Sequence, residues 1–148
     1  MFELKPYEET DEKVYLDLQQ ATYEKYVIEF FGVFDIAVTK KHLQILKPHL
    51  YKIIFENKLA GFIYFCEEEQ KITLDVFTLF PEFRNKGLGS NVMSSFVELS
   101  NKTNKPIFLD TFKTNPAKRF YERHGFEVVD ENMSHYILKY DYKNWFFY

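Results

Sequence analysis

The spacing of hydrophobic residues changes several times along the chain, and this change constrains the fold more than any other feature. A short strand at residues 2–8 precedes a region, 10–46, whose apolar residues recur at helical intervals. This region predicts two helices, the first beginning near Thr10 and the second capped by Thr39. Beyond residue 50 the pattern becomes short runs of β-branched and aromatic residues between polar turns. These runs predict an antiparallel meander of three strands, at 50–55, 59–66 and 72–79.

After residue 80 the helical spacing returns and predicts an amphipathic helix from about 87 to 101. The apolar run 106–110 then predicts a buried strand parallel to the third meander strand, because a strand–helix–strand unit crosses over right-handed. A short helix at 116–123 and a closing hairpin within 126–140 follow. The sequence therefore predicts an α/β fold (an α+β mixed sheet). Its central sheet is mostly antiparallel with one parallel strand pair, helices cover both faces, and residues 1–148 form a single domain.

Charge and composition exclude several functional classes. Lys and Arg number 19 and Asp and Glu 22, so the net charge is −3 and there is no basic block for nucleic-acid binding. The one cysteine, Cys66, cannot form an internal disulfide and reads as a buried core residue, so nothing indicates secretion. No apolar run approaches the roughly 20 residues of a membrane span, and the N-terminus lacks the apolar core of a signal peptide. We expect a soluble cytoplasmic enzyme or binding domain.

One segment between the third meander strand and the next helix carries the clearest chemical signal. It reads Leu79-Phe80-Pro81-Glu82-Phe83-Arg84-Asn85-Lys86-Gly87-Leu88-Gly89-Ser90. A turn at a helix N-terminus presents backbone N–H groups to an anion, best a phosphate or pyrophosphate. Gly87 and Gly89 permit unusual dihedral angles and close approach, Arg84 and Lys86 add charge, and Ser90 adds a donor. A glycine-rich turn with solvated basic residues explains this segment equally well when it is considered alone.

A second segment, 114–126, surrounds the predicted short helix. Asn115 is a good N-cap and Pro116 suits the first helical position. Ala117 and Tyr121 are four residues apart and share a face, so a small residue leaves room for a ligand beside the phenol. Alone, Tyr121 is better explained as a core aromatic, since the chain has 11 tyrosines.

Together, in this order, the two segments resemble the GNAT superfamily of N-acetyltransferases, of the small single-domain bacterial type. The first matches the family's Arg/Gln-x-x-Gly-x-Gly/Ala pyrophosphate loop at Arg84-Asn85-Lys86-Gly87-Leu88-Gly89. The second matches another family stretch at Asn115-Pro116-Ala117-x-x-x-Tyr121-Glu122-Arg123-x-Gly125-Phe126. The chain departs from the usual pattern at Phe80, where a polar residue is common, and at Thr114, where many members have the Asn. The resemblance covers the whole chain in element order and residues 72–126 in motif detail.

The resemblance implies a GNAT-like fold in which the parallel strand pair splays apart to admit the pantetheine arm of acetyl-CoA. It implies transfer of an acetyl group to a primary amine of a small molecule, amino acid or protein terminus, by direct attack in a ternary complex. A catalytically weak module that binds or senses acyl-CoA is the alternative. No metal is expected. The residues that the resemblance assigns to the co-substrate are Phe77, Thr78, Leu79, Arg84, Asn85, Lys86, Gly87, Leu88, Gly89, Ser90, Asn115 and Tyr121.

Catalytic roles follow from the same resemblance. Tyr121 is placed to protonate the leaving thiolate, and Asp75 on the third meander strand is the candidate general base. A solvated strand residue explains Asp75 equally well, and Glu24 and Glu29 are better explained by a solvated helix face. The four histidines show no metal-ligand spacing. The aromatic tail 141–148 is expected to pack on this subunit or a partner, which makes a homodimer plausible.

Overall fold

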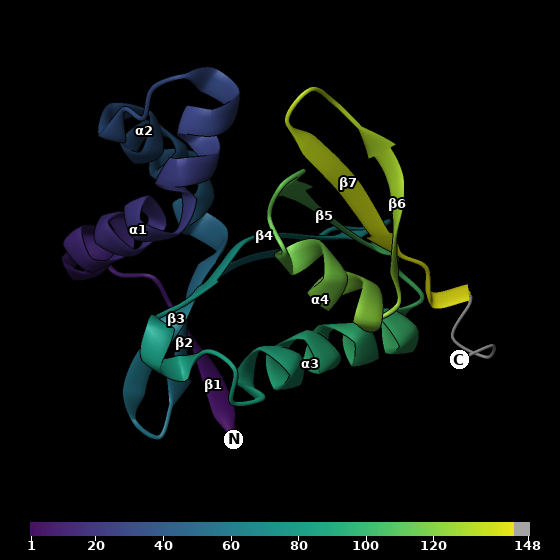
Figure 1. Cartoon of the computed structure of the whole chain (residues 1–148). Coiled ribbons are helices and arrows are strands. Elements are labelled where there is room, and N and C mark those ends of the chain that lie inside the picture. The colour runs from purple at the N-terminus through teal and green to yellow at the C-terminus, as the bar shows by residue number, and fades with distance from the viewer. Residues whose placement is uncertain (144–148) are drawn as a thin grey trace. The chain divides into compact units, whose positions relative to one another are not determined.

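The computed structural model describes residues 1–143 and forms a seven-stranded mixed sheet with helices packed against it (Figure 1). The strands are β1 (Phe2–Pro6), β2 (Leu50–Phe55), β3 (Lys58–Glu67), β4 (Ile72–Leu79), β5 (Ile107–Phe112), β6 (Phe126–Glu131) and β7 (His135–Tyr140). The α-helices are α1 (Glu12–Phe31), α2 (Ile36–Leu46), α3 (Leu88–Thr103) and α4 (Ala117–Arg123). Single 3-10 turns occur at η1 (Glu9–Asp11), η2 (Lys47–His49) and η3 (Pro81–Phe83).

The sheet order is β1-β2-β3-β4-β5-β7-β6. The pairs β1/β2, β2/β3, β5/β7 and β6/β7 are antiparallel, whereas β4 and β5 are parallel. The predicted fold class, element order and parallel pair are therefore confirmed. A tight turn at Glu56 and Asn57, both with positive φ, connects β2 to β3, and the chain crosses from β4 to β5 through α3.

The predicted caps of the first two helices are wrong. Thr10 lies inside η1, and the Asp11 carboxylate accepts a hydrogen bond from the Glu8 N–H at 2.8 Å. Thr39 lies within α2, whose start is capped by Asp35 through a 2.9 Å hydrogen bond from the Ala37 N–H. Only Asp35 therefore caps its helix through a carboxylate, whereas Asp11 is the N-cap residue of α1 without a side-chain cap.

The chain divides into two compact units. The first comprises Met1–Phe65 and Val76–Arg84, and its core joins α1 and α2 to the strands through Tyr15, Leu18, Leu43 and Phe62. Its two central rings, Tyr15 and Phe62, meet edge to face at 5.1 Å.

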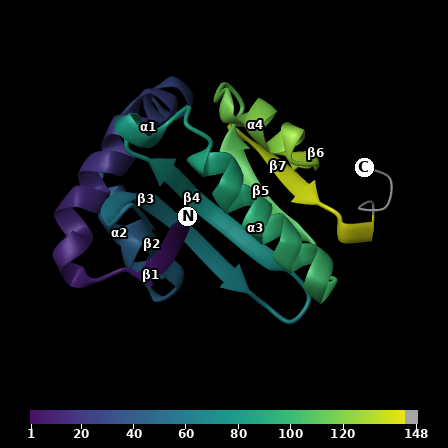
Figure 2. The same ribbon diagram turned by 90° about the horizontal axis from the view of Figure 1, so that it is seen from below.

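The second unit comprises Cys66–Asp75 and the described residues from Asn85 onward. Here α3 lies in front of β5 in Figure 2, and its buried face carries Val92, Met93 and Phe96. The Tyr140 hydroxyl donates a 2.8 Å hydrogen bond to the Asn101 side chain, so the face of β7 that carries Tyr140 is the face covered by α3. Among the described residues, no helix has the length and apolar character needed to cross a bilayer.

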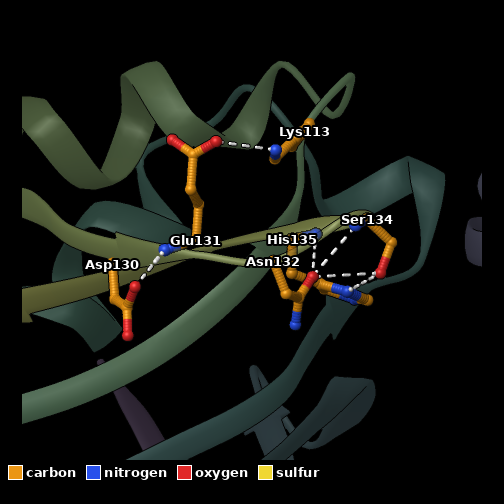
Figure 3. A network of polar contacts seen from close by, with 6 residues as sticks. All are labelled: Lys113, Asp130, Glu131, Asn132, Ser134 and His135. Carbon is orange, nitrogen blue, oxygen red and sulfur yellow. Dashed lines mark hydrogen bonds and ion pairs between the residues drawn. The ribbon is translucent and has the colours of Figure 1, made fainter.

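The closing hairpin is held by the polar network in Figure 3. The Asn132 side-chain oxygen accepts hydrogen bonds from the backbone N–H groups of Ser134 at 2.9 Å and His135 at 2.7 Å. Lys113 reaches across to Glu131 at 2.8 Å, and the Asp130 carboxylate accepts from the Glu131 N–H. An Asx-type turn of this kind satisfies backbone donors of the predicted closing hairpin locally.

Candidate functional site

The start of α3 leaves a row of backbone donors without helical partners. Gly87 adopts a left-handed conformation with φ 85° and forms the N-cap, and no side chain caps the helix. The Asn91 N–H bonds to the Gly87 carbonyl at 3.0 Å. The N–H groups of residues 88–90 therefore have no carbonyl one turn earlier in the helix, as at any helix start. The positive end of the helix dipole adds to these donors, which makes the turn suited to an anion.

Each residue of this loop has a distinct position. Leu88 is buried, so its side chain serves the core and only its backbone can contact a ligand. Gly89 lies in the first turn of α3, and it is absent from the residues with positive φ, so the unusual dihedral angle expected there is found only at Gly87. Asn85 takes φ 60° without being a glycine.

Some of the side chains around the loop already form hydrogen bonds within the protein. Among residues 1–143 the exposed Lys86 forms no ion pair, so its charge is available. Arg84 lies in the first unit, where its Nε donates a 2.9 Å hydrogen bond to the Leu79 carbonyl. The Ser90 hydroxyl lies 3.3 Å from His124 Nε2. Burial, and then the nearby Arg123, lower the pKa of His124, which favours the neutral imidazole as the partner of Ser90.

The end of β4 has an unusual backbone. Val76 has φ 44°, which is a true outlier for a β-branched residue, and Phe77, Thr78 and Leu79 follow it. Thr78 is 3% exposed, and its hydroxyl accepts a 3.0 Å hydrogen bond from Gln19 Nε2. Because the Thr78 side chain is committed to the core, a ligand can contact only the backbone of this residue.

Tyr121 is the predicted site residue with the most perturbed chemistry. The Asn115 side chain accepts a 2.9 Å hydrogen bond from the Ala117 N–H and so begins α4 as expected. Tyr121 is 9% exposed and its ring packs edge to face on Phe126 at 5.9 Å. No hydrogen bond joins its hydroxyl to any of the described residues.

Burial raises the pKa of the Tyr121 phenol above its usual value of about 10, and Asp75 and then Asp110 raise it further. The phenol is therefore protonated throughout the neutral range and can act only as a donor or a neutral acceptor.

Asp110 is a residue that the sequence analysis missed. The paired residues of β4 and β5 are Ile72 with Ile107 and Thr73 with Phe108. This pairing ends two residues before Asp75 and Asp110. The sequence predicted only that the two strands are parallel neighbours, and no motif drew attention to Asp110.

The structure also describes the surroundings of Glu24 and Cys66. Glu24 accepts a 2.6 Å hydrogen bond from Gln20 on its own helix. Cys66 is only half buried and lies near the end of β3, so its expected place in the core is wrong. Among the described residues, no group of three His, Cys, Asp or Glu side chains could hold a metal ion.

The predicted site residues are divided between the units. Phe77, Thr78, Leu79 and Arg84 belong to the first. Residues 85–90, Asp75, Asn115 and Tyr121 belong to the second.

The chain was compared with protein families and with curated proteins. A family model described as an acetyltransferase (GNAT) domain matches residues 47–128, more than half of the chain. A search of curated proteins by sequence found no match.

Solved structures share the fold. The chain is similar to PaiA N-acetyltransferase from Thermoplasma acidophilum in complex with coenzyme A, with TM-score 0.70 and 18% identity over 95% of this chain and 99% of that one. It is also similar to an acetyltransferase from Thermus thermophilus, with TM-score 0.72 and 17% identity over 94% and 96% of the two chains. Arabidopsis thaliana Naa50, in complex with the bisubstrate analogue CoA-Ac-MVNAL, gives TM-score 0.61 and 16% identity over 93% and 97%.

Proposed function

The chain belongs to the GNAT family of acetyltransferases, and from this premise we propose that it transfers an acetyl group from acetyl-CoA to a primary amine. The observation that carries the proposal is the open first turn of α3, where Gly87 leaves backbone donors and the helix dipole facing an anion. PaiA and Naa50, which share the fold, were solved with coenzyme A and with a CoA-based bisubstrate analogue.

We assign the binding roles as follows. The backbone donors of residues 88–90 and the charge of Lys86 fit the pyrophosphate of CoA. Arg84, Asn85 and Gly87 shape the loop. Backbone groups of Phe77, Thr78 and Leu79 fit the amide-bearing pantetheine arm, and the Thr78 side chain is held in the core. The Asn115 side-chain amide keeps its N–H donors for the same ligand, because only its oxygen caps α4.

The acceptor must be neutral to attack a thioester, yet a lysine-like amine has a pKa of about 10.4. Asp75 accepts the amine's proton, directly or through a water molecule. A bond forms between nitrogen and the acetyl carbon, and the bond between that carbon and sulfur breaks. A backbone N–H at the end of β4 is the candidate donor to the oxyanion between these events.

Tyr121 serves the leaving group. A thiol has a pKa of about 8.5, whereas the buried phenol has one above 10, so the phenol gives its hydrogen bond to the sulfur as negative charge develops. It then passes on a proton that solvent replaces. Transfer proceeds by direct attack in a ternary complex, with positioning as the main source of acceleration.

Cellular setting and assembly are part of the proposal. We propose a cytoplasmic location for the protein. A homodimer remains a prediction, and the aromatic tail on which it rests lies mostly in residues 144–148, outside the described residues.

The decisive experiment measures CoA affinity and amine-dependent release of free thiol from acetyl-CoA. Gly89→Val places a branched side chain over the first turn of α3, because helical Cβ atoms tilt toward the N-terminus. We expect it to weaken CoA binding by roughly tenfold or more and to abolish the rise in melting temperature that CoA causes.

Ser94→Val is the matched control, since it adds the same side chain at an exposed position further along α3. Unchanged CoA affinity in Gly89→Val contradicts the assignment of the loop. CoA binding without thiol release for any amine supports the alternative, an acyl-CoA-binding module.

A further inference from the structure

Two consecutive hydrogen bonds join helix α1 to the end of strand β4 within the first unit. Gln19 Nε2 donates to the Thr78 hydroxyl at 3.0 Å, although the two residues are 59 positions apart in the sequence. The Thr78 hydroxyl in turn donates to the Val76 carbonyl at 3.3 Å. All three residues belong to the same compact unit. A side chain of α1 is thereby linked to the backbone of β4 directly before Phe77.

The backbone at Val76 requires support from its surroundings. Its φ of 44° is unfavourable for a β-branched residue, and a strained backbone persists only where neighbouring contacts hold it. Strand β3 supplies one contact, because Gly61 lies so close that an added Cβ would overlap the Thr78 carbonyl oxygen. The Gln19 side chain supplies another through the Thr78 hydroxyl. The strand end is therefore held by both β3 and α1.

Glutamine is a costly residue at position 19. Gln19 is 3% exposed, and its side-chain oxygen is buried and accepts no hydrogen bond from any described residue. A buried polar atom without a partner lowers stability, and an apolar side chain of the same length would avoid that loss. Stability therefore favours an apolar residue at this position, so the glutamine is better explained by the group that its Nε2 holds in place.

We propose that Gln19 is a positioning residue that fixes the backbone of residues 76–79 through the Thr78 hydroxyl. This inference rests on the function proposed above. That function assigns backbone groups of Phe77, Thr78 and Leu79 to the pantetheine arm and a backbone N–H at this strand end to the oxyanion. Because its side chain is buried, Gln19 itself contacts neither substrate. It holds the backbone donors where the transition state requires them, since a displacement of about 1 Å can cost about 100-fold in rate.

Gln19→Met is the test, because methionine keeps the length of the side chain and its apolar packing and loses the amide. We expect kcat for acetyl transfer to fall by about tenfold or more, with the KM for acetyl-CoA changed by less than about threefold. The loss appears in kcat because the oxyanion contact exists only in the transition state. The melting temperature should stay within about 4 °C of the wild-type value, since the substitution also removes the unpartnered oxygen.

Gln20→Met is the matched control. It makes the same replacement one position along α1, where the Gln20 amide donates to Glu24 on its own helix at 2.6 Å. Its kcat should equal that of the wild type.

Variants of Thr78 test the hydroxyl that transmits the effect. Thr78→Val removes this hydroxyl and should lower kcat as Gln19→Met does, whereas Thr78→Ser retains it and should lower kcat less. The double variant Gln19→Met/Thr78→Val should lose no more than the larger single loss, because both changes interrupt the same pair of hydrogen bonds. Unchanged kcat in Gln19→Met, or losses that multiply in the double variant, overturn the inference.

A failure of the proposed function is distinguishable from a failure of this inference. If no amine stimulates thiol release, the proposed transfer fails, and hydrogen exchange of the backbone amides still decides the positioning role. Exchange that Gln19→Met accelerates by about tenfold or more at residues 76–79, and not in β2, supports this role. Exchange at residues 76–79 equal to that of the wild type, or acceleration that extends through β2, refutes it.

Discussion

At the scale of single residues, the Tyr121 hydroxyl shows how burial determines protonation. The ring lies between Phe120 and Phe126, and burial is the largest cause of its raised pKa. Asp75 and Asp110 act in the same direction, because a phenolate beside two carboxylates is disfavoured. The phenol is therefore protonated at neutral pH and is available as a donor.

Replacing this hydroxyl tests its role directly. Tyr121→Phe keeps the ring and its packing, so we expect kcat to fall by roughly 10²- to 10⁴-fold with little change in CoA affinity or stability. Steady-state kinetics with acetyl-CoA and the best acceptor measure the effect. Tyr51→Phe, on a half-buried strand residue of the first unit, is the control and should retain full activity. A stability loss with intact turnover would instead make Tyr121 a structural aromatic.

At the scale of elements, β3 and β4 approach each other closely where β4 carries its site residues. A Cβ at Gly61 would overlap the Thr78 carbonyl oxygen and lie 2.9 Å from Leu79 Cα. The glycine thus permits the backbone of the strand end to lie where it does. On the other side, Gln19 holds the Thr78 hydroxyl, while its own side-chain oxygen is buried without a partner among the described residues.

Adding one methyl group at this contact should disturb both stability and binding. Gly61→Ala forces β3 and β4 apart, so we expect a loss of about 1–3 kcal/mol in the free energy of unfolding. CoA affinity should fall as well, because the displaced atoms belong to Thr78 and Leu79. Urea denaturation and calorimetry with CoA provide the two measurements.

Gly32→Ala separates the two effects. Gly32 has φ 84°, with nothing within 4 Å of its Cβ position, so alanine there costs only left-handed strain, about 1–2 kcal/mol. It should lower stability and leave CoA affinity unchanged. If Gly61→Ala behaves in the same way as Gly32→Ala, the close contact has no role in binding.

At the scale of the whole molecule, stability should depend on pH through His124. Burial, and then Arg123, lower the pKa of this imidazole in the folded protein. The unfolded chain has the ordinary value of about 6.5, so it binds more protons as the solution becomes acidic. The contribution of neutral His124 to the free energy of unfolding is fully present above the pKa of the unfolded chain. It is lost as the pH falls through the pKa of the folded protein.

His124→Gln removes this titration and retains a polar partner for Ser90. We expect the unfolding free energy of the wild type to fall more steeply than that of the variant between about pH 7.5 and about pH 5.5. Chemical denaturation at both pH values gives the comparison. Parallel pH profiles for the two proteins would show that His124 does not contribute to this dependence.

Much of the architecture could be read from local patterns. The strands at 50–55 and 72–79 have the predicted bounds. The loop before α3 and the start of α4 at Asn115 were also predicted, because glycine, proline and amide side chains act on their immediate neighbours. The exchange of Thr10 and Thr39 for Asp11 and Asp35 as cap residues shows the limit of local reasoning: adjacent residues compete for the same donors.

The sequence by itself therefore determined the order and kind of the elements, since hydrophobic period and turn chemistry are short-range properties. Only the tertiary structure decided which residues that are distant in the sequence lie close together in space. The pairing of Thr73 with Phe108 depends on a strand register, and the contact between Ser90 and His124 depends on how α4 packs beside α3. The left-handed Val76 depends on a strained backbone that no propensity favours. Register and packing arise from the sum of many long-range contacts, so no single residue in the sequence signals them.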